Sequence, residues 1–498
     1  FFFNMARRPG SSRMNPAFAS ATDLAAMIQT RTISSRELLE LYLARVDRYN
    51  PALNAIVVDI RDQARKDAAE MDEETARSAS RGAFHGVPMT IKESYNVVGT
   101  PTTWGNPAWK DNVPDEDAEA VKRMKAAGVS LFGKTNVPLA LADFQSYNEV
   151  YGTTNNPWRH DRTPGGSSGG SAVALAAGLT GIEAGSDIGG SIRNPAHFCG
   201  VFGHKPTWNL LWMRGHSAPG DLRSTPDISV IGPMARSAHD LASAMRILAS
   251  PDPITARGLS LNLPTLNHRK TSDLRVAVWR DDEQCPVSRE VQTRVERVAN
   301  ALRNKGAYVN DSARPAFSAA SSHETYQRLL QATMASRAPQ EEYDRLVAQA
   351  ASYASDDRST AAEVFRNQTA RFREWATANE ARQQLRWRWH EFFQNYDVLI
   401  APVAPTSAFP QDQRKFSERT INVDNQEIPY FQQVFWAGLS GVSLLPSTVI
   451  PTGLDAEGLP IGIQIIGPEY SDLVTIGVAQ GLEDEDGFRF TPPPAYVG

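Results

Sequence analysis

The order of the predicted elements indicates an α/β protein, with a mixed and largely parallel central sheet that helices cover on both faces. Short apolar runs of strand length alternate along the chain with longer segments whose apolar residues recur at helical spacing. In the middle, residues 172–177 form an alanine-rich run that we expect to be a buried helix leading into a short strand. Strands that alternate with helices are typical of such layered sheets.

The elements before residue 165 follow from apolar periodicity, end signals and charge. We expect a helix from the capping box of Ser34 and Glu37 to about Pro51, a strand at 54–58, a solvated helix to Arg77, a strand at 87–91, a helix at 117–127, a strand at 129–133 and a helix at 135–144. The strand at 87–91 delivers Lys92 to its carboxyl end, which is the usual place for chemistry in an α/β sheet.

The elements after residue 207 follow from the same signals. We expect a turn at 232–237 that leads into a helix ending near 248, a strand at 274–279, an amphipathic helix at about 287–302, a long helical region at about 318–394, strands at 397–402 and 458–467, and a last helix after Ser471. The long helical region is rich in Arg, Gln and Trp, and we interpret it as a cover over the sheet.

The chain shows no internal repeat and no long low-complexity linker, so we expect residues 15–498 to form a single domain. Residues 1–14 are set apart from it. They begin with three Phe residues before a basic pair and have no apolar run after it, unlike a secretory or transit sequence. We expect this end to be disordered or an expression remnant.

Composition excludes several classes of function. The net charge of −5, from 51 basic and 56 acidic residues, gives no electrostatic footprint for nucleic acid. No segment approaches the ~20 apolar residues that span a bilayer, so a cytoplasmic location is the default. Two cysteines cannot form a disulfide framework, and Cys199, which stands among apolar residues, is expected to be a buried small side chain.

Two clusters of Gly and Ser, at residues 165–171 and 186–191, flank the alanine-rich run. Gly lets a backbone or a ligand approach closely, so Gly-Gly beside Ser suits an anion pocket lined by backbone next to a nucleophilic hydroxyl. A flexible linker is the alternative for the first cluster. That alternative is weak, because the apolar run that must be buried follows the cluster at once.

A serine hydroxyl is a poor nucleophile unless a neighbouring base removes its proton. The chain has nine His residues, none in a recognisable Ser-His-Asp pattern, although folding could still bring one close. A lysine can serve instead if burial keeps it neutral. Lys92, at the end of an apolar strand, is placed for that role.

Four motifs carry a resemblance to a known family. They read GVPMTIKE at 86–93, GGSSGGS at 165–171, GSDIGGSIR at 185–193 and CGVFGHKPT at 199–207. In these motifs and their order the chain resembles the amidase signature family of serine hydrolases. Weaker similarity continues into the late strands, so the resemblance covers nearly the whole chain and implies that family's fold.

The resemblance also implies roles for individual residues. Ser191 would be the nucleophile, Ser167 a bridging serine held by a cis peptide bond, and Lys92 the base. Members of the family separate the two serines by 24 residues, and this spacing selects Ser167 over its neighbours. The oxyanion hole would consist of the backbone N–H groups of Ile188, Gly189, Gly190 and Ser191. We expect Asp187 and Arg193, which flank the site, to form structural ion pairs or hydrogen bonds that fix the loop.

The implied reaction is hydrolysis of a non-peptide carboxylic amide through an acyl-enzyme, without metal or cofactor. Aryl esters and carbamates (urethanes) present a similar acyl carbon, so they are expected as further substrates. The expected partner is a small-molecule amide, ester or carbamate, with neither nucleic acid nor membrane, and the chain would act alone or as a homodimer. Trp208, Trp212 and Met213 depart from the family pattern and would bear on substrate choice, although each also fits a core position.

Other interpretations stay open at this point. Some members of the family are glutaminase subunits of tRNA-dependent amidotransferases. Residues 165–169 also satisfy G-x-S-x-G, the nucleophile elbow of α/β-hydrolase esterases, which would make Ser167 the nucleophile. A catalytically silent scaffold is disfavoured by the intact Lys92 and serines. A P-loop lacks its G-K-[ST], and a zinc motif at His390 lacks its second His.

Overall fold

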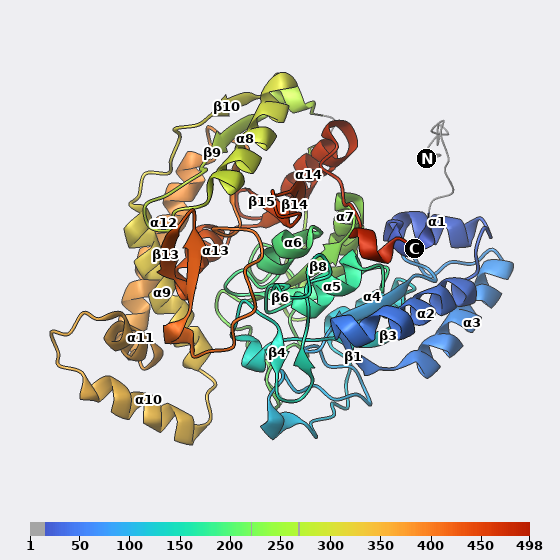
Figure 1. Cartoon of the computed structure of the whole chain (residues 1–498), viewed down its shortest axis with the longest axis horizontal. Helices are drawn as coiled ribbons and strands as arrows, with labels where there is room; N and C mark the ends of the chain where they lie inside the picture. Colours follow the sequence, from blue (N-terminus) through green and yellow to red (C-terminus); the bar gives the residue numbers. More distant parts are fainter. Residues whose placement is uncertain (1–14, 221, 267–268) are drawn as a thin grey trace.

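The computed structural model describes residues 15–220, 222–266 and 269–498, so the expectation for residues 1–14 lies outside the described residues. The α/β class is confirmed. An eight-stranded mixed sheet and a three-stranded sheet are surrounded by helices. In Figure 1 the early helices α2 (Ser35–Leu53) and α3 (Arg61–Ala76) lie at one end of the molecule, and α10 (Gln340–Ser352) and α11 (Thr360–Gln368) lie at the other.

The smaller sheet has the order β1-β3-β2, with β1 at Ile56–Asp59, β3 at Ser130–Thr135 and β2 at Pro88–Lys92. Strands β2 and β3 run parallel, and Lys92 lies opposite Thr135. The capping box that begins α2 is confirmed, but the helix continues past Pro51 to Leu53 before Asn54 turns into the left-handed region.

The larger sheet has eight strands. Their order is β10 (Tyr308–Asn310), β9 (Arg275–Val278), β11 (Val398–Pro402), β15 (Pro460–Ile466), β14 (Ser447–Leu454), β7 (Phe202–Lys205), β8 (Val230–Ala235) and β6 (Glu183–Asp187). A parallel bridge between Met89 of β2 and Ile182 joins the two sheets beside the start of β6. The end of β2 and the start of the second Gly/Ser cluster are therefore neighbours.

The prediction that the sheet is largely parallel is wrong. Among the strand pairs of the larger sheet in the described part of the chain, two are parallel and five are antiparallel. Strands β7, β8 and β14 lie in segments that the sequence did not identify as strands, and each pairs antiparallel with its neighbours. Strand β8 also takes up most of the turn expected at 232–237.

Helices cover both faces of the larger sheet, as predicted. Alternate residues of a strand point to opposite faces. In β9 and β11, Val276 and Ile400 pack in the cluster that includes α8 (Arg289–Asn304) and α14 (Asp472–Asp486). Ala277 and Leu399 pack in a second cluster with α9 (Ala319–Ala335), α12 (Phe372–Phe392) and α13 (Val434–Gly441).

The remaining elements are short. They are α1 (Ala21–Gln29), α4 (Glu119–Ala126), α5 (Gly169–Ala176), α6 (Arg193–Cys199), α7 (Ala238–Leu248), the hairpin of β12 (Thr420–Val423) and β13 (Gln426–Pro429), and the small pair β4 (Tyr147–Asn148) and β5 (Gly152–Thr153). Every residue of α5 is buried, which confirms the helix predicted from the alanine-rich run.

The helix predicted at 135–144 does not form. Strand β3 ends at Thr135, and only a 3₁₀ turn at Leu139–Leu141 follows. Ala140 and Leu141 take φ angles of 53° and 60°, outside the helical region. Pro138 also keeps the residue before it away from helical angles. The segment is therefore a loop, and it borders the site described below.

Two broader expectations concern the whole chain. The described residues contain no helix with the length and apolar character that a bilayer crossing requires. The single domain expected for residues 15–498 stays a prediction, and the bridge between the two sheets supports it.

Arg236, directly after β8, is a buried link between the N-terminal helices and the sheet. It is 3% exposed and donates hydrogen bonds to the carbonyl oxygens of Ala19, Leu175 and Thr180.

We expect Arg236→Gln to lower the free energy of unfolding by about 3 kcal/mol or more, because buried carbonyl groups lose their donor. Urea unfolding checks this. Arg246→Gln, at an exposed position of α7, is the matched control and should change stability by less than about 0.5 kcal/mol; equal losses in the two variants would contradict the assigned role of Arg236.

Candidate active site

Lys92 ends β2 in a fully buried position, and its amino group is surrounded by hydroxyls. Its Nζ donates to the Oγ atoms of Ser167 at 2.7 Å, Ser168 at 2.9 Å and Ser186 at 2.9 Å. The structure thus brings together Lys92 and Ser167, as the sequence predicted. Ser168 and Ser186 are contacts that the sequence reasoning missed, although both stand in the Gly/Ser clusters that it had singled out.

Burial governs the protonation of this lysine. Removal from water lowers the pKa of Lys92 well below its usual value, while the nearby Asp187 and Glu183 act in the opposite direction. Its hydrogen-bond partners are hydroxyls and include no carboxylate among the described residues. The environment therefore favours a neutral amine, which can accept a proton from a hydroxyl.

The loop that carries Ser167 is held by side chains on both sides. The peptide bond between Gly166 and Ser167 is cis, as the resemblance implied. Ser146 donates to the carbonyl of Gly165 at 3.0 Å and accepts from the N–H of Gly169 at 3.2 Å. A Cβ at Gly166 would lie 2.4 Å from the carbonyl oxygen of Asp143, so any larger residue would push the loop away from its neighbour.

Ser191 follows the loop after β6 and is 7% exposed. Its carbonyl accepts a hydrogen bond from the N–H of Ser168 at 3.1 Å, which ties the two Gly/Ser clusters together. In the part of the chain that the structure describes, the hydroxyls of Ser167 and Ser191 are not hydrogen-bonded to each other.

The four predicted oxyanion donors differ in what they bind. The N–H of Gly190 donates to Asp187 Oδ1 at 2.9 Å, so in this structure it is engaged by a carboxylate, contrary to expectation. The N–H groups of Ile188, Gly189 and Ser191 have no hydrogen-bond partner among the residues that are described. These three can therefore face a developing oxyanion.

Tyr326 of α9 fixes the same loop from the helical cover. Its hydroxyl donates to the carbonyl of Ile188 at 2.7 Å, and the side chain is fully buried. No sequence signal pointed to this residue, because it comes from the helical region least constrained by the motifs. The contact links α9 directly to the segment that carries the backbone donors.

The structural role predicted for Asp187 and Arg193 is confirmed, and the two residues form a buried ion pair. Arg193 Nη2 lies 2.9 Å from Asp187 Oδ1, and both side chains are excluded from solvent. Although burial raises the pKa of Asp187, the adjacent guanidinium lowers it to about 2. Arg193 also donates to Ser440 Oγ at 2.8 Å and Gln464 Oε1 at 3.2 Å, so the loop is anchored to α13 and β15.

A small cavity of about 30 Å³ adjoins Ser191. Most of its walls are apolar, and the lining residues are Leu141, Ala142, Asp143, Phe144, Ile188, Gly189, Ser191, Leu330, Met334, Phe431 and Val434. Phe144 and Phe431 are the aromatic residues here, whereas Trp208, Trp212 and Met213, which the sequence had suggested for substrate choice, are not part of this lining.

Asp143 is the ionisable residue of this cavity, and its charge is already compensated. Arg419 Nη1 donates to one carboxylate oxygen at 2.6 Å, and the hydroxyl of Tyr430 donates to the other at 2.6 Å. Both Asp143 and Arg419 side chains are less than 10% exposed. The cavity therefore offers a bound group an apolar surface without an uncompensated charge.

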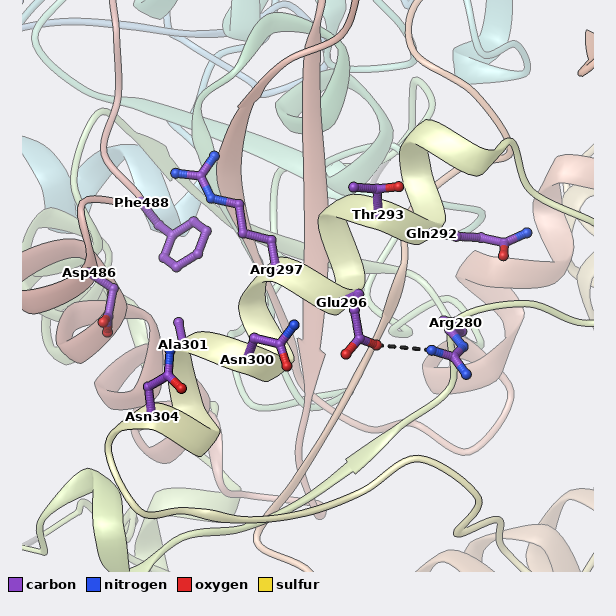
Figure 2. Close-up of a pocket in the computed structure, with 10 residues that line it drawn as sticks. All are labelled: Arg280, Gln292, Thr293, Glu296, Arg297, Asn300, Ala301, Asn304, Asp486 and Phe488. Atoms are coloured by element: carbon purple, nitrogen blue, oxygen red, sulfur yellow. Dashed lines mark hydrogen bonds and ion pairs between the residues drawn. The ribbon is translucent and has the colours of Figure 1, made fainter.

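A larger hollow of about 720 Å³ lies away from this site, on the outer side of α8 (Figure 2). Its lining residues are Arg280, Gln292, Thr293, Glu296, Arg297, Asn300, Ala301, Asn304, Asp486 and Phe488. These side chains are mostly polar or charged, and Arg280 pairs with Glu296 at one edge of the hollow. No candidate nucleophile or base of the sequence analysis is among them, so size alone does not mark the functional site.

In the described ranges no three His, Cys, Asp or Glu side chains gather as a metal-binding group. Cys199 is fully buried, and burial raises the pKa of its thiol, in agreement with the predicted role as a small core side chain. Its Sγ lies 3.5 Å from the carbonyl oxygen of Pro164, beside the first cluster.

Comparison with known proteins decides the family. Residues 37–475 match the family described as Amidase. The chain belongs to the amidase family. The resemblance noted in the sequence is thus confirmed, and the protein is an amidase signature hydrolase that acts on amide bonds.

Three relatives show the range of this amidase family. The chain is 32% identical to an indoleacetamide hydrolase of Bradyrhizobium diazoefficiens, over 94% of the chain and 86% of the relative. It is 31% identical to a glutamyl-tRNA(Gln) amidotransferase subunit of an Anaeromyxobacter species, over 94% and 96% of the two chains. The solved structure of a bacterial aryl acylamidase of the amidase signature family shares the fold, with a TM-score of 0.78 and 24% identity over 94% and 96% of the chains.

The lowered pKa of Lys92 predicts a pH dependence of stability. A lysine that binds its proton less tightly in the folded state than in the unfolded state makes the protein less stable as pH falls below the unfolded pKa of about 10.4. The loss continues down to the pKa of the folded state. We expect Lys92→Met to reduce this slope, because Met has nearly the same shape and no proton to bind.

Urea unfolding of the amidase from neutral pH to about pH 10 measures the slope. Lys122→Met, at a surface position of α4, is the control and should leave it unchanged. Identical slopes in the wild type and in Lys92→Met would show that the lysine titrates as in water.

Proposed function

We propose that this amidase acts alone on non-peptide carboxylic amides, through an acyl-enzyme on Ser191, with Ser167 and Lys92 relaying the proton. The observation that carries the proposal is the 2.7 Å contact between a buried lysine and the Ser167 hydroxyl. A lysine that burial drives toward the neutral form is a competent general base.

The steps follow from the positions of the groups. Neutral Lys92 takes the proton of Ser167, and Ser167 takes the proton of Ser191 once the two hydroxyls meet. Ser191 Oγ then attacks the carbonyl carbon, and the oxyanion that forms is stabilised by backbone N–H groups of Ile188 and Gly189, and by that of Ser191 itself. The relay returns the proton to the departing nitrogen. Water later enters by the same route and releases the acid.

The cavity beside Ser191 favours substrates that carry a neutral, apolar substituent next to the scissile carbonyl. Its walls are mostly apolar, and the charge of Asp143 is compensated by Arg419. Aryl esters and carbamates (urethanes) belong to the proposal as further substrates, because they present a similar acyl carbon to the same nucleophile. The cytoplasmic location and the homodimer expected from the sequence remain parts of it.

A glutaminase subunit of a tRNA-dependent amidotransferase is the second candidate. The relative from Anaeromyxobacter, an amidotransferase subunit by name and 31% identical, favours it. Free glutamine carries an ammonium and a carboxylate group, and the cavity beside Ser191 offers no uncompensated charge to pair with either. The esterase alternative with Ser167 as nucleophile is disfavoured because a nucleophile elbow follows a strand, whereas residues 154–166 form no strand beyond an isolated bridge at Arg162.

We expect Ser191→Ala to abolish turnover and Lys92→Ala to lower kcat by roughly 10⁴-fold, while both variants stay folded. The first change removes the nucleophile, and the second removes the group that accepts its proton. Steady-state kinetics, with circular dichroism as the test of folding, measure both. Ser168→Ala is the matched control, since Ser168 contacts Lys92 without belonging to the relay, and a smaller loss is expected. Turnover retained by Ser191→Ala would reject the nucleophile, and a larger loss in Ser167→Ala than in Ser191→Ala would favour the esterase alternative.

A substrate panel separates the two candidate functions. The purified chain alone is given anilides, aliphatic primary amides, aryl esters, carbamates and glutamine, with Ser191→Ala as the blank. We expect cleavage of neutral substrates with an apolar acyl or aryl group, because the walls beside Ser191 are mostly apolar. Silence on all of them except a trace of glutaminase activity would instead indicate a subunit that needs its partners.

A further inference from the structure

A second ionisable side chain is buried near Lys92, and the proposed mechanism does not use it. Glu183 is the first residue of β6 and is 1% exposed. One oxygen of its carboxyl group accepts a hydrogen bond from the hydroxyl of Thr90. The other oxygen, Oε2, is buried and has no hydrogen-bond partner among the described residues. An unpartnered buried carboxylate oxygen is unfavourable, so its position needs a reason.

The surroundings of Glu183 are those of the catalytic lysine. Thr90 stands two residues before Lys92 on β2, so both side chains leave the same side of the strand. The hydroxyls of Thr135 and Ser171 also stabilise the charged form of the carboxyl group, and they are hydrogen-bonded to each other at 2.9 Å. Thr135 is the residue opposite Lys92 in the sheet. The strands that hold Lys92 thus also hold Glu183.

The other charged groups near Glu183 are already engaged. Lys92 and Tyr95 both respond to the charge of Glu183, and the Tyr95 hydroxyl donates to the carbonyl of Gly185 at 2.6 Å. Asp187, on the same strand, is paired with Arg193. Arg236 donates to the backbone carbonyls just before Glu183 in the chain. Of the ionisable groups that these contacts bring near Glu183, Lys92 is therefore the cation whose charge is not balanced by a direct ion pair among the described residues.

We infer that Glu183 is a positioning residue of this site: a carboxyl group behind Lys92 whose charge controls the pH at which the lysine gives up its proton. This role of Glu183 rests on the proposed role of Lys92 as the base.

The charges of Glu183 and Lys92 are coupled. Burial raises the pKa of Glu183 to about 8 and lowers the pKa of Lys92. A charged Glu183 favours the ammonium form of Lys92, and a protonated Glu183 favours the neutral amine. The two groups therefore titrate together. Compared with a lysine beside an uncharged neighbour, Lys92 loses its proton at higher pH and over a wider pH range.

The test observes Lys92 directly. The chain is labelled with ¹³C at the lysine Cε atoms, and the signal of Lys92, identified by its loss in Lys92→Met, is followed against pH. We expect Glu183→Gln to move the midpoint to lower pH by about one unit and to make the titration a single step. The amide has the shape of the protonated acid but cannot become charged. The pH profile of kcat/KM should shift its acid limb in the same direction.

The matched control is Asp240→Asn. Asp240 is also a fully buried carboxylate, but it accepts hydrogen bonds from the backbone of Ala21 and Thr22 at the start of α1. We expect this variant to lose stability and to leave the Lys92 midpoint unchanged. An equal shift in both variants would mean that the Lys92 midpoint follows general destabilisation, which would overturn the inference.

Two further outcomes keep the inference apart from the proposed function. An unchanged Lys92 midpoint in folded Glu183→Gln overturns the inference even if the enzyme is active. If wild-type hydrolysis does not depend on Ser191, the proposed function fails, while the lysine signal still decides the inference. Should Glu183→Gln not fold, Thr90→Val replaces it: loss of the hydroxyl makes the carboxyl harder to ionise, so a smaller shift to lower pH is expected, and its absence contradicts the inference.

Discussion

The removal of Lys92 from water is the interaction on which the rest of this structure depends. An isolated buried ammonium is strongly unfavourable, and the environment can lower that penalty by letting the lysine release its proton. The three hydroxyls around Nζ can accept a hydrogen bond from an ammonium or donate one to an amine. A carboxylate in direct contact would instead have fixed the charge. Hydroxyl partners leave the lysine free to change its protonation state.

Several elements must meet to create this environment. Lys92 comes from β2, Ser167 and Ser168 from the segment just before α5, and Ser186 from β6. The bridge between Met89 and Ile182 brings β2 beside the start of β6. Two buried polar side chains fix the loop after β6: Arg193 holds it through Asp187, and Tyr326 holds it from the helical cover. The position of the backbone N–H groups in the loop after β6 therefore depends on contacts with several distant elements of the fold.

The sequence predicted local features well and distant ones poorly. The buried α5, the strand that ends at Lys92 and the capping box of α2 each have a signal within a few residues. The antiparallel strands β7, β8 and β14 do not, because pairing depends on partners far along the chain. The apolar residues at 135–144 favour a helix, although Pro138 and the backbone of Ala140 exclude one. For the site, motif order selected Lys92, Ser167 and Ser191, while the contacts of Tyr326 and Glu183 required the fold.

Covalent trapping of the nucleophile tests the central claim most directly. The protein is treated with an aryl sulfonyl fluoride, its intact mass is measured, and peptide fragmentation then locates the adduct. We expect one adduct per chain on Ser191, absent in Ser191→Ala and formed far more slowly in Lys92→Ala. An adduct on Ser167, or labelling at an undiminished rate without Lys92, would contradict the proposed relay.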